Sequence, residues 1–350
     1  MQNKDHIWRL PTDIDYKALL PERGASDKLA ISIPLFSSSF QFVKEAKSRE
    51  YFQQVHVKGA VWASLAMLNN TDFGENGVQT YFHVEDTVLK SAKVIFDAMR
   101  VPEEYIRVVK TDDIHAQLKN IKNLRYGKKF ACLFDDLPID NWLVMDSDAF
   151  ACTRDEKIKL YDIFDSPWTE SNPIAFNYYL NPFDYKHWIE RIYNAIGNQV
   201  PKKSELWEQE AAAFEDVGLE IDNKSDKGKE HVIRPTNKTV LFALNKNSEL
   251  ADFLRQNLNK CCEDEFLIAM WSINRPILSL SDAIGLPMFY SMGAYLNNNP
   301  PQYMHHVIYE AHNANPFFSR FYKDMTRHIS LPQTKQLRAW KKLYYNLSHK

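Results

Sequence analysis

Two aspartates separated by one serine, Asp146 and Asp148, are the residues whose type and spacing most clearly suggest chemistry. They follow an apolar run, Trp142 to Met145, in the stretch NWLVMDSDAF, and the chain turns apolar again after them. Two neighbouring carboxylates are costly to hold together unless a positive group lies beside them, and a divalent cation is the obvious candidate. Magnesium and manganese prefer oxygen ligands and commonly keep open positions for substrate phosphates. An isolated D-x-D is more often a solvated turn, so the elements around this one decide between the two interpretations.

The first half of the chain alternates between expected strands and helices. Apolar runs at 28–36, 78–84 and 105–110 predict strands, and apolar residues at helical spacing predict helices over 51–68 and 87–100. Helical material is expected over 114–137, before the strand that ends in the D-x-D. Such alternation is typical of a parallel sheet covered by helices. Ligands bind outside the carboxyl ends of the strands in such sheets, where Asp146 and Asp148 would lie.

The second half is less regular. We expect a polar, charged loop over 223–238, a strand over 239–244, a helix from about Ser248 to Leu258 and another over 263–273. The whole is interpreted as one domain over 1–350. Two halves, 28–150 and 151–330, would precede a basic tail at 331–350.

Composition excludes several other classes of protein. Hydrophobic residues make up 45% of the chain and charged residues 25%, as in ordinary globular proteins. A formal net charge of −2 argues against a dedicated nucleic-acid binder. Glycine occurs only 10 times, and the glycine-rich dinucleotide and P-loop motifs, the hydrolase elbow G-x-S-x-G and the zincin motif H-E-x-x-H do not occur.

The beginning of the sequence lacks the apolar core and the cleavage site of a secretory signal, which predicts a cytoplasmic protein. The four cysteines lack C-x-x-C spacing and are expected to be reduced. No apolar run approaches the roughly 18 residues of a membrane span, so only peripheral membrane contact is left open.

The segment KKFACLFDDLPIDNWLVMDSDAF resembles a stretch of the nucleotide-sugar-dependent glycosyltransferases of the GT-A fold, where a helix precedes an apolar strand that ends in a D-x-D motif. The order of elements is similar over roughly residues 28–290. The resemblance implies a GT-A (Rossmann-like) α/β fold, with a mostly parallel central sheet flanked by helices and a less regular acceptor-side half. It also implies that Asp146 and Asp148 hold Mn²⁺ or Mg²⁺ on the diphosphate of a nucleotide-diphosphate sugar.

The resemblance further implies a set of donor-binding residues. In GT-A enzymes the loop after the first strand and the acidic end of a following strand hold the nucleoside, and a basic residue before the D-x-D strand often faces phosphate. The matching residues here, together with the serine inside the motif, are Pro34, Ser37, Asp86, Lys129 and Ser147. Asp86 also suits a helix start, and Lys129 with Lys128 also suits a solvated pair.

A second acidic cluster, with Glu263 and Asp264, opens the expected helix over 263–273. Acidic residues are favoured in a first helical turn, which is the structural explanation. If the reaction inverts the anomeric carbon, a general base must accept the proton of the acceptor hydroxyl, and Asp264 is our candidate. Many GT-A enzymes add a late histidine to the metal; among three late histidines, at 305, 306 and 312, we choose His312, although the family's glycine and lysine after it are missing.

These observations predict a metal-dependent glycosyltransferase in glycan biosynthesis, a hexosyl- or pentosyltransferase with a saccharide or glycoconjugate acceptor. Haloacid-dehalogenase-like phosphatases share the D-x-D after an apolar strand, but they usually carry it near the start of the domain. A nucleotidyltransferase would usually show a glycine-rich N-terminal loop, which is absent. A non-catalytic sugar-binding protein on a transferase fold is the third alternative.

Overall fold

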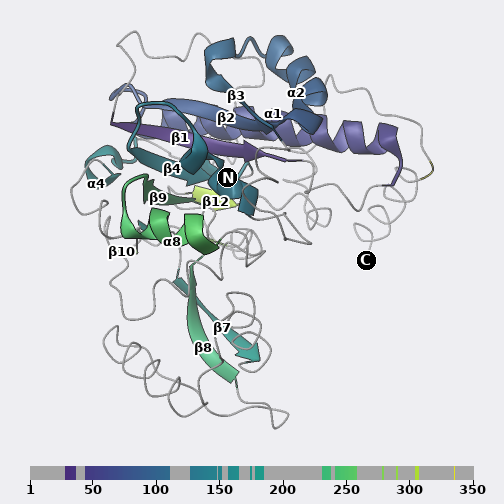
Figure 1. The fold of residues 1–350 in the computed structure, drawn as a ribbon. Helices are drawn as coiled ribbons and strands as arrows, with labels where there is room; N and C mark the ends of the chain where they lie inside the picture. The colour runs from purple at the N-terminus through teal and green to yellow at the C-terminus, as the bar shows by residue number, and fades with distance from the viewer. Residues whose placement is uncertain are drawn as a thin grey trace, which may run out of the picture.

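The computed structural model of the chain describes the following residues: 28–36, 44–110, 127–147, 149–151, 157–164, 174–175, 178–184, 231–237, 241–257, 278–279, 289–290, 304–306 and 335. Within them the main feature is a seven-stranded sheet in the order β10-β6-β9-β4-β1-β2-β3 (Figure 1). Its strands are β1 Leu29–Leu35, β2 Gln79–Glu85, β3 Ile106–Val109, β4 Asn141–Met145, β6 Ile174–Ala175, β9 Leu241–Asn245 and β10 Leu278–Ser279.

The sheet is mostly parallel. β1 is parallel to both of its neighbours, β2 and β4, and β3 is parallel to β2. β9 is antiparallel to β4 on one side and to β6 on the other. The expected α/β fold class with a mostly parallel central sheet is therefore confirmed.

Alternate residues of the central strands point to opposite faces, and each face has its own apolar core. One core joins the sheet to two helices, α1 Ala46–Asn70 and α2 Asp86–Ala98. The other joins it to a 3₁₀ segment, η5 Gly127–Phe134, and to α8 Glu249–Asn257. Because helical elements cover both faces, the strands are buried and carry the apolar runs seen in the sequence.

The predicted strands of the first half and the helices expected over 51–68 and 87–100 agree with the structure to within a few residues, and α1 begins five residues earlier than expected. Of the helical material expected over 114–137, residues 114–126 lie outside the described residues and 127–134 form the 3₁₀ segment η5. The helix expected over 263–273 also lies outside the described residues. The expected helix near Ser248 is also confirmed, because the Ser248 hydroxyl accepts the Ala251 amide at 3.2 Å and so caps α8. A further 3₁₀ turn, η4 Glu103–Tyr105, leads into β3. None of the described helices combines the length and apolar character needed to cross a bilayer.

One expectation was wrong. The loop expected over 223–238 contains β8 His231–Asn237, which pairs antiparallel with β7 Tyr178–Asp184. Figure 1 shows this two-stranded ribbon apart from the central sheet. The sequence HVIRPTN has neither polar alternation nor a continuous apolar run, and the pairing of its backbone with β7 is what makes it a strand.

Three short elements complete the region around the D-x-D. β5 Ala149–Ala151 directly follows it, and α4 Tyr161–Phe164 comes next along the described chain. β12 Met304–His306 pairs antiparallel with β5 and parallel with β11 Phe289–Tyr290.

Candidate functional site

The carboxyl ends of β4, β1 and β2 meet at one edge of the sheet, because these neighbouring strands are parallel. Asp146 directly follows β4, and Asp86 directly follows β2. Pro34 is the second-last residue of β1, beyond the last β1–β4 pair at Ser32, so its missing amide is not needed by that neighbour. The structure therefore brings these three predicted site residues to the edge where ligands bind in such folds.

Asp146 forms an ion pair with Lys129 of η5. The Lys129 Nζ lies 2.7 Å from Oδ1 of Asp146, and the side chains are 10% and 29% exposed. At this separation a charge-assisted hydrogen bond forms, and partial burial reduces its screening by water. Lys129 is therefore not a solvated lysine, and its expected contact with phosphate stays a prediction.

Ser147 faces helix α1. Ser147 is buried, and its Oγ lies 3.0 Å from Nε2 and 3.2 Å from Nδ1 of His56. The amide of Ala149 donates to the carbonyl of Asp146 at 3.2 Å, which is the hydrogen bond of a four-residue turn. A side chain of helix α1 thus contacts the serine of the motif, and a backbone hydrogen bond closes the turn.

Asp86 is the first residue of α2 and is exposed. Its Oδ1 accepts the amide of Thr87 at 2.8 Å, which satisfies one of the free amides of the first helical turn. The preceding Glu85 is buried at the end of β2. Asp86 therefore has the structural role expected of a helix start, and it is exposed at the sheet edge.

Five predicted site residues lie outside the described residues: Ser37, Asp148, Glu263, Asp264 and His312. The pairing of β12 with β5 nevertheless brings two other late histidines close to the motif along the backbone. His306 is paired with Ala149, and His305 with Phe150. His306 thus stands opposite the residue that directly follows Asp148.

Among the residues that the structure describes, no group of three or more histidine, cysteine or acidic side chains is arranged to hold a metal. Within the described residues the motif contributes one carboxylate, Asp146, at the carboxyl edge of the sheet. Asp148 comes two residues later in the sequence. Carboxylate oxygens are the ligands that Mg²⁺ and Mn²⁺ prefer, so the chemistry of these donors fits the expected ions.

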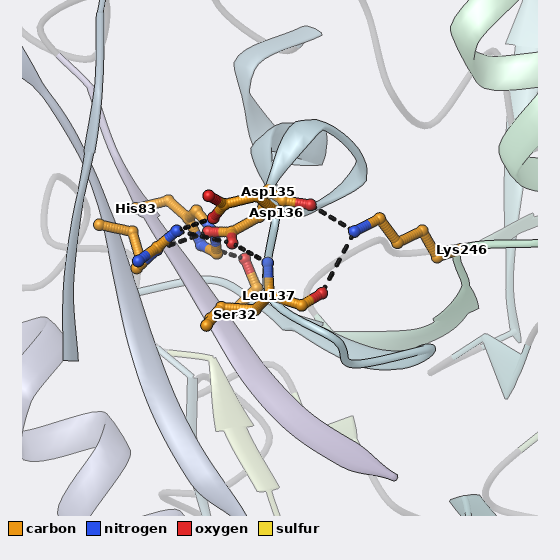
Figure 2. A network of polar contacts seen from close by, with 7 residues as sticks. Ser32, His83, Asp135, Asp136, Leu137 and Lys246 are labelled. Carbon is orange, nitrogen blue, oxygen red and sulfur yellow. Dashed lines mark hydrogen bonds and ion pairs between the residues drawn. The ribbon is translucent and has the colours of Figure 1, made fainter. Parts of the chain in front are cut away.

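A second polar network joins side chains of β1, β2 and β3 to Asp135, which follows η5, and to Lys246, which follows β9 (Figure 2). His83 Nδ1 is 2.9 Å from Ser32 Oγ, and its Nε2 is 3.0 Å from Oδ2 of Asp135. Arg107 donates to both carboxylate oxygens of Asp135 at 2.9 and 3.0 Å. Lys246 donates to the Asp135 carbonyl, as Figure 2 shows.

This network sets the protonation of its members. Burial lowers the pKa of His83, although its contact with Asp135 acts in the opposite direction. Burial alone would raise the pKa of Asp135, but hydrogen bonds from His83, Arg107 and the Leu137 amide outweigh it and hold that pKa well below its usual range. At neutral pH a histidine with a lowered pKa is uncharged, so its Nε2 donates to the Asp135 carboxylate and its Nδ1 accepts a hydrogen bond from the Ser32 hydroxyl.

A Ser–His–Asp chain suggests a hydrolytic triad, but this one cannot act as such. Ser32 is 0% exposed and His83 is 1% exposed, and the Asp135 side chain is 3% exposed. No substrate can reach the serine. Ser32, His83 and Asp135 instead form a buried hydrogen-bond network that fixes the end of η5 against the sheet.

Two features of this region were not predicted from sequence. His56 lies 91 residues from Ser147, within a largely buried helix, and no motif marks it. Ser32 and His83 are 51 residues apart, and His83 and Asp135 are 52 residues apart. The only available signal was a polar residue inside each buried strand, Ser32 in LAISIPL and His83 in QTYFHVE, because buried polar groups need partners.

Comparisons with known proteins add little beyond the fold. No model of a protein family matches the chain, and no curated protein matches it. Among solved structures it is similar to the galactosyltransferase LgtC in complex with donor and acceptor sugar analogues, at a TM-score of 0.41 and 11% identity, over 90% of this chain and 99% of that one. It is also similar to apo mouse xyloside xylosyltransferase 1, at a TM-score of 0.38 and 12% identity, over 80% and 97% of the two chains. At such scores we argue the function from the site alone.

Proposed function

We propose that this protein is a metal-dependent glycosyltransferase of the GT-A fold, which transfers a sugar from a nucleotide-diphosphate sugar to a hydroxyl of a saccharide or glycoconjugate acceptor. The observation that carries the proposal is the ion pair of Lys129 with Asp146 at the carboxyl end of β4. A cation and a partly exposed carboxylate at this edge suit a ligand that brings both a metal ion and phosphate groups.

The metal, Mn²⁺ or Mg²⁺, would be held by Asp146, Asp148 and a late histidine. When bound, it supplies positive charge to the leaving diphosphate. Our sequence candidate for the histidine is His312. The register of β12 with β5 supports His306 as a competing candidate, since it is paired with the residue after Asp148.

The residues of the chain divide the remaining tasks. Lys129 would bind a diphosphate oxygen while staying close to Asp146, which places fixed positive charge where negative charge develops. Pro34, Ser37 and Asp86 would line the nucleoside, and an aspartate such as Asp86 can accept hydrogen bonds from ribose hydroxyls. In an inverting reaction Asp264, beside Glu263, would accept the proton of the attacking acceptor hydroxyl.

The experiment is nucleotide release from a panel of nucleotide-diphosphate sugars with Mn²⁺, with Mg²⁺ and with chelator. We expect release from one donor that requires metal and falls at least about a hundredfold in Asp148→Ala, because the diphosphate loses its principal counter-charge. Asp97→Ala, which removes an exposed aspartate on α2, is the matched control and keeps full activity. Phosphate release from small phosphate esters, with no donor bound, would instead establish the dehalogenase-like alternative.

A further inference from the structure

We propose that His56 of α1 is a positioning residue for the D-x-D: by binding the Ser147 hydroxyl, it fixes the turn that presents the two carboxylates to the metal. This inference rests on the proposed function and extends it to a helix that the motif itself does not include.

The contact between the two side chains is close and sheltered. Ser147 is 5% exposed, and its Oγ is 3.0 and 3.2 Å from the two ring nitrogens of His56. Both ring nitrogens are thus within hydrogen-bonding distance of the hydroxyl, which can donate to one or accept from the other. A buried hydroxyl without a partner loses the hydrogen bonds it had in water, so the contact with His56 favours this one orientation of Ser147.

Ser147 directly follows Asp146 and precedes Asp148 in the sequence, so its placement constrains the backbone that carries Asp146. The turn hydrogen bond from Ala149 to Asp146 links the backbone on either side of Ser147. Lys129 holds the carboxylate of Asp146 from the η5 side. His56 contacts the serine from α1. The motif is therefore contacted by two elements, α1 and η5, that cover opposite faces of the sheet.

Helix α1 is itself tightly packed, so it can fix the position of Ser147. The neighbours of His56 along the helix, Val55 and Val57, are 3% and 0% exposed and belong to the main core. At the end of the helix the side-chain amide of Asn70 donates to the Ala151 carbonyl at 2.8 Å. The helix therefore contacts the chain at two points, at Ser147 within the motif and at Ala151 at the end of β5.

Groups that orient metal ligands influence metal affinity without touching the metal. Loss of such a group typically weakens metal binding by about 10- to 100-fold. We expect about a tenfold weaker Mn²⁺ affinity in His56→Leu, which keeps the bulk but removes the hydrogen bond. His56→Gln can still donate to or accept from the Ser147 hydroxyl and should recover most of the affinity.

The experiment titrates Mn²⁺ into the full chain and measures free Mn²⁺ by electron paramagnetic resonance, so the result does not depend on turnover. The variants are His56→Leu, His56→Gln, Ser147→Ala and the double variant His56→Leu/Ser147→Ala. Gln54→Leu, two residues away on the same helix, is the matched control for an added leucine and keeps the wild-type affinity. Near-ultraviolet circular dichroism verifies that each variant is folded.

The double variant identifies the route of the effect. If His56 acts through Ser147, the two substitutions remove the same interaction, and the double variant binds Mn²⁺ no more weakly than the weaker single variant. Additive losses, or a loss in His56→Leu with none in Ser147→Ala, would overturn the inference. Should His56→Leu not fold, Ser147→Ala decides by itself, since it breaks the same hydrogen bond from the motif side.

Asp146→Asn separates this inference from the proposed function. If Asp146→Asn binds Mn²⁺ like the wild type, the metal site assigned to the motif is wrong. If Asp146→Asn loses the ion while His56→Leu and Ser147→Ala retain wild-type affinity, the metal site stands and the positioning role of His56 is wrong.

Discussion

At the scale of single residues, the pair of Lys129 and Asp146 has two competing consequences for ligands. The lysine neutralises the carboxylate at 2.7 Å, so a metal ion must compete with it for the same oxygen atoms. The same lysine supplies positive charge to any phosphate that arrives with the metal. One substitution should therefore change metal affinity and phosphate affinity in opposite directions.

Lys129→Met tests this expectation, because it keeps the aliphatic stem and removes the charge. We expect Mn²⁺ alone to bind several-fold more tightly, since Asp146 is left without its partner. We expect a nucleoside diphosphate with Mn²⁺ to bind about tenfold more weakly, since a charge-assisted hydrogen bond is lost. Isothermal titration calorimetry measures both affinities.

The matched control is Lys157→Met, which removes an exposed lysine that pairs with Glu75 away from the sheet edge. Exposed pairs of this kind contribute little, so both affinities should equal those of the wild type. If Lys129→Met weakened both ligands equally, the lysine would act through the fold of η5, and its proposed contact with phosphate would be refuted.

At the scale of elements, η5 connects the interior to the candidate site. Lys129, near its start, holds Asp146, and Asp135, directly after its end, binds His83 of β2 and Arg107 of β3. The buried network therefore anchors the segment that supplies the lysine. Breaking a buried ion pair by removing one partner typically costs about 3–5 kcal/mol, so this anchor is expected to withstand local motion.

The same network predicts a loss of stability in acid. The pKa of His83 is lowered from 6.5, so below about pH 6.5 the unfolded chain binds a proton that the folded chain does not. The pKa of Asp135 is lowered from 3.8, so its contribution is present above about pH 4 and is lost as the pH falls further. Both shifts make the free energy of unfolding decrease as the pH falls.

Urea unfolding between pH 8 and pH 4 measures this decrease. We expect the His83 contribution to the slope to approach about 1.4 kcal/mol per pH unit below pH 6.5 and to disappear in His83→Gln, which cannot be protonated. Asp97→Asn, at an exposed aspartate of α2, should keep the wild-type slope. An unchanged slope in His83→Gln would mean that other groups dominate acid unfolding.

The elements of the first half could be predicted because burial on both faces of a parallel sheet forces apolar strands, and helices between them carry a 3.6-residue period. The position of Asp146 at the sheet edge followed from the same pattern. Lys129 was singled out through the family resemblance, but its contact with Asp146 and the contact of His56 with Ser147 could not be predicted, since they join elements on opposite faces that only the folded chain brings together. β8 was missed because backbone pairing leaves little trace in side-chain periodicity.

At the scale of the whole molecule, the site joins elements from both faces of the sheet, so a ligand that binds it should stabilise the folded chain as a unit. Ligands that bind only the folded state add about 2.7 kcal/mol at a hundred times their dissociation constant. For a chain of 350 residues this corresponds to a rise of a few degrees in Tm. Mn²⁺ with a nucleoside diphosphate should produce this rise in the wild type when measured by differential scanning calorimetry.

The pattern across variants distinguishes binding at the motif from non-specific stabilisation. Asp146→Asn should abolish the rise, because it removes a metal ligand without disturbing the apolar cores on either face. Lys129→Met should show at least the wild-type rise with Mn²⁺ alone and lose most of the additional rise with the diphosphate, since the lysine competes with the metal for Asp146 but binds the phosphate. A rise of equal size in the wild type and in Asp146→Asn would place the ligand elsewhere on the molecule, and the assignment of the sheet edge as the donor site would then be incorrect.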